Sequence, residues 1–402
     1  MNKTKNKQKL LEDYIITNEG ILQLSPTWVP RAFLSPGRRL KLINTDLYAL
    51  GKERGGITER WLASTTNADN GPGTPEDEGL SYIIIDPKMQ KSKILLKEAI
   101  DLIGDEILGK KIMVKHKGWM VLTKFFDNMD PIPFHIHQDD IQAKEVNRLG
   151  KPEAYYFPEQ LNFTQNNFPY TFFGLIPGTT KKDIQKCLMR WDQGDNGILN
   201  FSKAYHLEPG TGWSIPPRIL HGPGTLVTYE IQKASDVFAM FQSLVGGNSI
   251  NWDLVIKDVP QDKYENLEYI VDLIDWEANL DPNFKEHHFC APKPVNKIED
   301  MNAAGYEEHW VIYGMEEFSG KRHTIFPGQS IVIKENAAYG LIAIQGYGTI
   351  DKLPLETPTQ IRYGEITNDE YFITYEKAKA GVTFTNLSKS ENLVILKHFG
   401  PN

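Results

Sequence analysis

Short apolar runs separated by turn-forming residues cover most of this chain, and the pattern is typical of a mainly β protein. Residues 119–126 predict one strand, and residues 154–157 predict another with Glu153 at its start. A strand over 213–215 is expected to end at the two prolines that follow, because proline cannot donate a hydrogen bond to a strand ladder. The alternation therefore predicts short strands joined by turns.

Helices interrupt this pattern at a few places. Apolar residues between 92 and 108 recur at helical spacing, and the predicted helix ends at Gly109. Another helix is predicted to begin at Thr180, which can form a capping box with Asp183, and to run towards Arg190. Residues 1–20 predict a short polar helix or a loose arm.

Similar stretches occur in both halves of the chain. A proline–glycine turn followed by a strand occurs at 207–215 and again at 326–333, and residues 343–350 predict a hairpin. This likeness suggests two β-barrels of one type. We expect an N-terminal segment (1–110) that completes the first barrel and adds a helix, a metal-binding barrel with a helical insertion (111–260), a connector (261–290) and a second, metal-free barrel (291–402).

Composition narrows the classes of function. The chain has 402 residues, of which 40% are hydrophobic and 24% charged, an ordinary composition for a water-soluble protein. A net charge of −8 and the lack of a basic run disfavour nucleic acid as a partner, and no apolar run approaches the length of a membrane span. Two cysteines, Cys187 and Cys290, make no disulfide scaffold, so a cytoplasmic location is the simplest interpretation. The sequence leaves the oligomeric state open, with a homo-oligomer as one option.

Three histidines and one glutamate form a candidate metal site. His135 and His137 lie two residues apart, so on a strand both imidazoles leave the same face. Glu153 follows at the start of the next predicted strand, and His221 lies just beyond another. A lone His-x-His pair is weak evidence, but the complete set is a sufficient shell for a divalent transition metal. Three other histidines are isolated and are expected to be ordinary surface or core residues: His309, His323 and His398.

Several blocks in order resemble one family. They read E-R-W-L-A-S at 59–64, V-L-T-K-F-F-D at 121–127, P-F-H-I-H-Q-D-D at 133–140, G-K-P-E-A-Y-Y at 150–156 and Y-E-I-Q-K-A-S-D at 229–236. With them, residues from about 20 to 245 resemble the class I mannose-6-phosphate isomerases, metal-dependent enzymes of the cupin superfamily. The resemblance implies a mainly β fold of two cupin-type (jelly-roll) β-barrels with a few helices inserted.

The resemblance also implies an activity and its residues. The activity is the interconversion of an aldose and a ketose, as a sugar or sugar phosphate, through an enediol. Zinc would be bound by His135, His137, Glu153 and His221, catalysis would use Glu230, Lys151 and Lys124, and substrate would be held by Glu59, Trp61 and Asp140. These residue types suit the chemistry, because the proton transfer needs a base, a polarised carbonyl and charge stabilisation.

Two departures from the family pattern leave alternatives open. The family's glutamine ligand is His135 here, which makes manganese, iron or nickel more plausible besides zinc. The arginine of the family's S-D-x-T-Y-R motif is assigned to Ala239, and its loss puts the standard reaction in doubt. A non-catalytic sugar-binding relative and a metal-dependent cupin oxygenase are therefore the alternative hypotheses.

Overall fold

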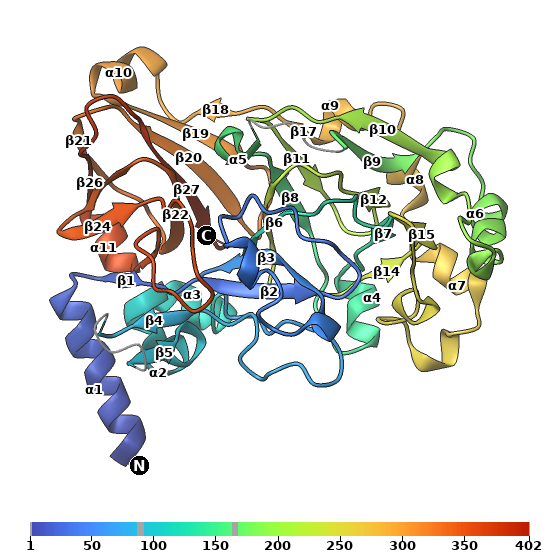
Figure 1. Ribbon diagram of the computed structural model, residues 1–402, viewed down its shortest axis with the longest axis horizontal. Helices are drawn as coiled ribbons and strands as arrows, with labels where there is room; N and C mark the ends of the chain where they lie inside the picture. Colours follow the sequence, from blue (N-terminus) through green and yellow to red (C-terminus); the bar gives the residue numbers. More distant parts are fainter. Residues whose placement is uncertain (1, 87–91, 163–167, 402) are drawn as a thin grey trace.

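The computed structural model describes residues 2–86, 92–162 and 168–401, and antiparallel sheets dominate it (Figure 1). A seven-stranded and a five-stranded sheet face each other and form what we call the first sandwich; a seven-stranded and a four-stranded sheet form the second sandwich. Each sheet is open, with two edge strands, so the described residues form no closed barrel, and the prediction of two jelly-roll barrels is not confirmed. The prediction of a mainly β protein is confirmed.

The first sandwich contains strands from several distant parts of the sequence. Its seven-stranded sheet has the order β17 (Phe289–Cys290), β11 (Gly212–Ile215), β8 (Glu153–Tyr156), β13 (Thr228–Lys233), β6 (Val121–Phe126), β3 (Gly56–Leu62) and β2 (Thr27–Arg31). Its five-stranded sheet has the order β10 (Ser202–His206), β9 (Tyr170–Leu175), β12 (His221–Gly222), β7 (His135–Ile136) and β14 (Ala239–Met240).

The second sandwich is formed mostly by the C-terminal part of the chain, coloured orange to red in Figure 1. Its seven-stranded sheet has the order β1 (Ile21–Gln23), β25 (Glu370–Ile373), β22 (Tyr339–Gln345), β27 (Leu393–Phe399), β20 (Ser319–Ile325), β19 (Tyr306–Ile312) and β18 (Lys293–Pro294). Its four-stranded sheet has the order β21 (Ser330–Ile333), β26 (Val382–Asn386), β23 (Tyr347–Ile350) and β24 (Leu353–Glu356). The N-terminal strand β1 therefore belongs to the second sandwich.

Strand alternation divides the side chains of the first sandwich between two environments. On β6 and β13, Phe125, Tyr229 and Ile231 pack in a core shared with the second sandwich. The alternate residues Lys124 and Glu230, paired directly across these strands, face the interior of the first sandwich. The two seven-stranded sheets thus share an apolar core, while the inner face of the first one is free to carry polar groups.

Helices cover the edges and outer faces of the sheets. They are α1 (Asn2–Thr17), α2 (Leu96–Leu108), α3 (Lys110–His116), α4 (Asp140–Glu145), α5 (Glu159–Asn162), α6 (Lys181–Leu188), α7 (Leu267–Asp272), α8 (Trp276–Asn279), α9 (Phe284–His288), α10 (Ile298–Ala303) and α11 (Tyr375–Ala380). In addition, β4 (Tyr82–Ile84) pairs with β5 (Lys93–Leu95), and β15 (Leu244–Val245) pairs with β16 (Asn248–Ser249). None of the described helices combines the length and apolar character needed to cross a bilayer.

Several local predictions can be compared with these elements. The Thr180–Asp183 capping box is present and α6 follows it, and α2 ends before Gly109 as expected. The start of α2 was predicted too early, because β5 occupies the residues just before Leu96. The hairpin predicted at 343–350 was wrong: β22 and β23 belong to different sheets, and Gly346, with φ of 79°, turns the chain from one sheet to the other.

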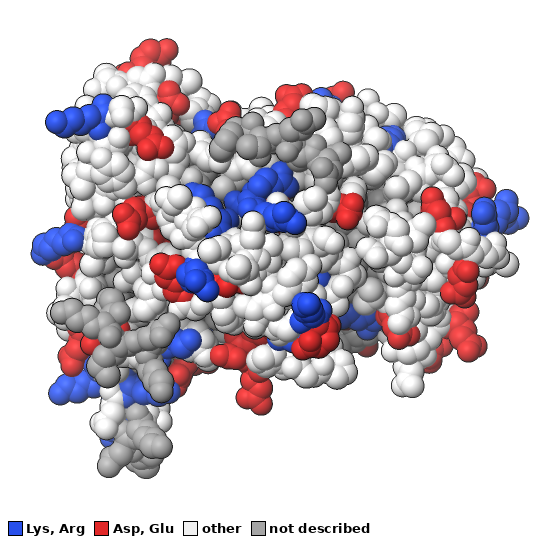
Figure 2. Space-filling model, in the orientation of Figure 1, with Lys and Arg blue, Asp and Glu red and all other residues white. Residues whose placement is uncertain are grey.

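Acidic and basic side chains are interspersed over the face seen in Figure 2, apart from a small group of basic atoms near its centre. The net charge of −8 is therefore not gathered into one acidic surface on this side of the molecule.

Candidate metal centre and cavity

Three buried histidines meet inside the first sandwich. His135 on β7 and His221 on β12 are directly paired across neighbouring strands, and His137 follows two residues after His135. Their ring nitrogens lie within 4.8 Å of one another. The i, i+2 spacing predicted from sequence therefore brings both imidazoles to one side, and strand pairing adds the third.

Each histidine has its ring nitrogen Nδ1 against a backbone carbonyl. The partners are the oxygen of Pro133 at 2.6 Å for His135, of Val237 at 2.7 Å for His137 and of Ile219 at 2.8 Å for His221. Because a carbonyl oxygen only accepts, Nδ1 carries the proton and Nε2 of each ring is left as the acceptor. On His137 this acceptor faces the ammonium of Lys151 at 3.0 Å, so a bound cation would take the place of that contact. This orientation is the usual support for a metal-binding histidine.

Glu153 completes the cluster from the opposite sheet. Its carboxylate lies 3.0 Å from Nε2 of His137 and 3.1 Å from Nε2 of His221, and the hydroxyl of Tyr155 donates a short hydrogen bond to it. Burial alone would raise the pKa of Glu153, but Lys151, His137 and His221 hold it well below its ordinary value. The glutamate is therefore ionised, as a metal ligand must be.

The electrostatics of the histidines suit the same role. Burial lowers the pKa of His135 well below its ordinary value, and burial together with the charge of Lys151 lowers the pKa of His137 to about 4. Both rings are neutral near pH 7. In addition, Nε2 of His221 is buried without a hydrogen-bond partner among the described residues, while Oε2 of Glu153 faces Nζ of Lys151 at 3.1 Å. A cation bound here would satisfy the nitrogen of His221, so the three imidazoles and the carboxylate fit a divalent transition metal.

Lysines and acids surround this cluster in a buried cavity of about 60 Å³. Glu230 lies 3.3 Å from Lys124 and 3.7 Å from Lys151, and Lys151 also lies 3.1 Å from Glu153. Burial and the negative charge of Glu153 raise the pKa of Glu230 to about 7, against the opposing effect of the two lysines. A carboxyl group that titrates near neutrality can both take up and release a proton.

The cavity also contains two residues that sequence reasoning did not assign to the site. Arg31 donates to both oxygens of Glu59, at 2.8 and 3.2 Å, and lies 3.6 Å from Asp236. Burial opposes ionisation of Asp236, but the charges of Arg31, Lys257 and the two cavity lysines together outweigh it and lower the pKa of that carboxyl. Asp236 was part of a recognised block and could have been found there, whereas nothing in the local sequence distinguishes Arg31.

The predicted substrate-binding residues occupy different places. Glu59 lines the cavity, 3.8 Å from Lys124. Trp61 is fully buried beside it and donates its indole N–H to Glu59 at 2.6 Å, so it supports the site from behind. Asp140 does not line the cavity; its exposed carboxylate accepts from Lys233 and from the N–H of Gly150.

The residue that faces the cavity on β14 is not Ala239. Ala239 pairs with Ile136, and both belong to the apolar core on the outer side of the sheet. Met240 pairs with His135 and lines the cavity. Counting S-D-x-T-Y-R from Ser235 likewise places the sixth position at Met240, so the assignment of the arginine position to Ala239 requires correction.

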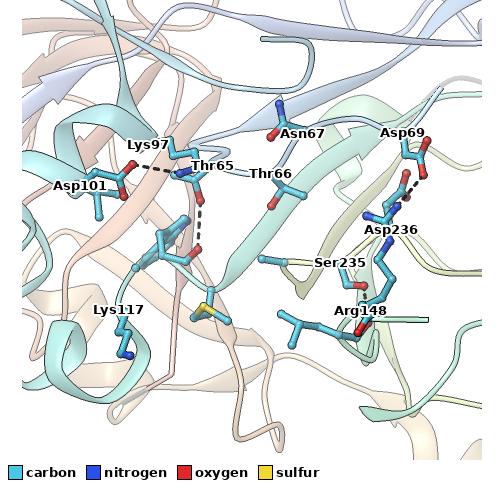
Figure 3. Close-up of a pocket in the computed structure, with 17 residues that line it drawn as sticks. Thr65, Thr66, Asn67, Asp69, Lys97, Asp101, Lys117, Arg148, Ser235 and Asp236 are labelled. Atoms are coloured by element: carbon cyan, nitrogen blue, oxygen red, sulfur yellow. Dashed lines mark hydrogen bonds and ion pairs between the residues drawn. The ribbon is translucent and has the colours of Figure 1, made fainter. Parts of the chain in front are cut away.

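Two larger spaces adjoin the cavity. A cleft of about 1,150 Å³ shares Arg31, Phe33, Leu34 and Phe238 with it, so these side chains lie at the junction between the cavity and the surface. A pocket of about 500 Å³ shares Asp236. Figure 3 looks into this pocket: Asp236 lies at one end with Asp69, Arg148 and Ser235, while Lys97 and Asp101 lie at the other.

The solved structures that this chain resembles include mannose-6-phosphate isomerases. Mannose 6-phosphate isomerase from Bacillus subtilis matches with a TM-score of 0.61 and 15% identity, over 94% of this chain and 99% of that one. A variant of phosphomannose isomerase from Salmonella typhimurium matches with a TM-score of 0.60 and 12% identity, over 95% and 100%. A zinc-bound mannose 6-phosphate isomerase matches with a TM-score of 0.60 and 13% identity, over 95% and 100%. No protein-family model and no curated protein sequence matches the chain. At these identities the likeness establishes the fold.

Proposed function

We propose that this protein is a metal-dependent isomerase that interconverts an aldose and a ketose. The observation that carries the proposal is the buried cluster of three imidazoles and an ionised carboxylate, with Glu230 and two lysines beside it. The fold shared with sugar-phosphate isomerases supports the same reaction class. The paired sheets are also compatible with cupin-type jelly rolls.

His135, His137, Glu153 and His221 would hold the ion, for which zinc is our first choice and manganese, iron or nickel are alternatives. A bound divalent ion would supply Lewis-acid polarisation of substrate oxygens. The remaining chemistry falls to the chain's own residues around it.

Glu230 is positioned to move the proton. As the carboxylate it takes the proton from C2 of the aldose, which leaves an enediol, and it returns that proton to C1 to give the ketose; the hydroxyl proton passes from the C2 oxygen to the C1 oxygen. The ammonium groups of Lys124 and Lys151, both held beside Glu230, can stabilise negative charge on those oxygens. Phe33, Leu34 and Phe238 at the junction limit the access of water.

The test combines elemental analysis with an isomerisation assay. Purified protein should contain one equivalent of a divalent transition metal, and the metal-replete protein should interconvert mannose or glucose, free or as the 6-phosphate, with fructose or its phosphate. A His221→Ala variant should lose the metal and the activity together. Metal-replete protein that binds these sugars without converting any of them would overturn the proposal in favour of a sugar-binding role, and stoichiometric iron or manganese with oxygen consumption would favour an oxygenase.

A further inference from the structure

The cations of the metal cavity are all bound to carboxylates of the same cavity. Arg31 holds Glu59 through two hydrogen bonds, Lys124 lies 3.3 Å from Glu230, and Lys151 lies 3.1 Å from Glu153. Each of these charges therefore already has a buried partner. A second anion that entered the cavity would have to compete with a carboxylate for its cation, or remain unpaired and desolvated.

The charge balance leads to the same conclusion. Three cations (Arg31, Lys124 and Lys151) and four carboxylates (Glu59, Glu153, Glu230 and Asp236) line the cavity, so these side chains together contribute one negative charge when Glu230 is ionised. A divalent ion would leave the site with a single positive charge. A phosphate monoester carries about −1.5 to −2 at pH 7 and is recognised by clustered donors that are free to bind it.

The approach to the cavity offers few free donors either. In the cleft outside, Arg54 is paired with Glu78 at 2.6 Å and Lys257 with Asp69 at 3.3 Å. Among the cations described there, only Lys52 has no recorded carboxylate partner, and it is exposed. One exposed lysine falls short of the forked or clustered contacts by which proteins usually hold a phosphate.

The cavity also has an apolar wall, formed by Phe33, Leu34, Ile132, Phe238 and Met240. Phe33, Leu34 and Phe238 reach the junction with the cleft beside Arg31, and Met240 lies on β14 opposite His135. Apolar and aromatic walls with a few placed polar groups suit the C–H faces and hydroxyls of an uncharged sugar.

We propose that the substrate is an unphosphorylated monosaccharide. We also propose that Met240 determines specificity, because an uncharged side chain at this position leaves the cavity with no cation available to a phosphate group. This inference rests on the proposed isomerase function and narrows it to one substrate class. Met240 acts by its position in the cavity wall and takes no part in proton transfer.

The first experiment compares substrates of the metal-replete wild-type protein. The values of kcat/KM for mannose, glucose and fructose are compared with those for their 6-phosphates. We expect the free sugars to be preferred by at least about tenfold, the discrimination that one missing charge-assisted hydrogen bond provides. Equal or better turnover of the phosphates would overturn the substrate inference while leaving the isomerase proposal intact.

The second experiment keeps the inference testable if the isomerase proposal fails. Calorimetric titration of the metal-replete Glu230→Gln variant with mannose and with mannose 6-phosphate measures binding without turnover. Tighter binding of the free sugar supports the inference even if the wild-type protein converts neither. Tighter binding of the phosphate, or binding of neither, overturns it.

The third experiment changes the wall itself. Met240→Arg should shift the ratio of kcat/KM towards the 6-phosphates by about tenfold or more, because a fourth cation among the four carboxylates removes the net negative charge that opposes a phosphate. Met240→Leu is the matched control and should retain the wild-type preference. Thermal unfolding and metal content of both variants establish that they are folded and loaded. A Met240→Arg variant that is folded and loaded but keeps the wild-type ratio would contradict the role assigned to Met240.

Discussion

Replacement of Glu230 by glutamine tests two effects of burying this carboxylate among lysines: its role as the base in turnover, and its cost to the stability of the fold. The amide keeps the shape of the side chain but cannot carry the proton between C1 and C2. General acid–base catalysis contributes about 10²- to 10⁴-fold, which is about 3–5 kcal/mol of activation free energy. We therefore expect kcat for the preferred sugar to fall by at least about 100-fold, with metal content unchanged.

The same substitution is expected to stabilise the metal-free protein. Burial and Glu153 raise the pKa of Glu230 from 4.5 to about 7, so its ionisation in the folded state is unfavourable. The folded state holds the proton to higher pH than the unfolded state does, so the carboxyl group lowers the free energy of unfolding as pH rises from 4.5 to about 7. At pH 8 this penalty is fully present and amounts to about 3 kcal/mol. Glutamine removes it, while Lys124 and Lys151 keep Glu59 and Glu153 as partners.

The assay is urea unfolding of the metal-free proteins at pH 8 and pH 5, together with turnover of the metal-replete proteins. The variant should be more stable than the wild type at pH 8, and the difference should shrink at pH 5. Glu335→Gln is the matched control: it removes a buried carboxylate paired with Lys321 and Lys397 in the second sandwich, and should leave kcat unchanged. Unchanged turnover in Glu230→Gln would refute its role as the base. A loss of stability at pH 8 would refute the electrostatic reasoning, because Glu230 would then stabilise the fold through its ion pairs.

Three further predictions concern other contacts. Tyr155→Phe removes the hydroxyl that donates to Glu153, and should weaken metal affinity by about 10- to 100-fold in a competition titration with a chelator. Unchanged affinity would contradict the view that Glu153 binds the metal with the support of this hydrogen bond. Lys397→Met leaves two buried glutamates with weaker pairing and should cost about 3–5 kcal/mol of unfolding free energy in urea. Lys352→Met, at an exposed ion pair, should leave the unfolding free energy almost unchanged, and similar costs for both variants would contradict the burial argument. Burial lowers the pKa of His398 to about 3, so below about pH 6.5 the unfolded chain takes up a proton that the folded protein does not. For this group the free energy of unfolding should therefore fall by about 1.4 kcal/mol for each pH unit below about 6.5. His398→Gln should reduce this dependence on pH.

Local residue patterns predicted much of this molecule. The capping box at Thr180 and the glycine at the end of α2 depend on hydrogen bonds within a few residues, so the sequence contains all that is needed to recognise them. The spacing of His135 and His137 fixes their common direction once they lie in extended backbone. The meeting of these two with His221 was predicted from a family-like pattern, and the structure places the three rings together.

Long-range packing decided what the sequence could not. The residues predicted to form a hairpin at 343–350 instead connect two sheets, because β22 pairs with the distant strand β27 and β23 pairs with β26. Likewise β1 joined the second sandwich through pairing with β25, about 350 residues away. The ion pair of Arg31 with Glu59 and the exposure of Asp140 depend on which strands become neighbours, and no local signal carries that information.

The distinction is sharpest at the cavity wall. The sequence alone determined that no arginine occurs between Ser235 and Met240, where the motif that it resembles has one. Counting along the motif places Met240 at that position, but where its side chain points was decided only by the pairing of β14 with β7, since strand alternation points Ala239 into the outer core and Met240 towards the histidines. A shift of one residue in that pairing would exchange the two, so the chemistry of this wall is a property of the tertiary register.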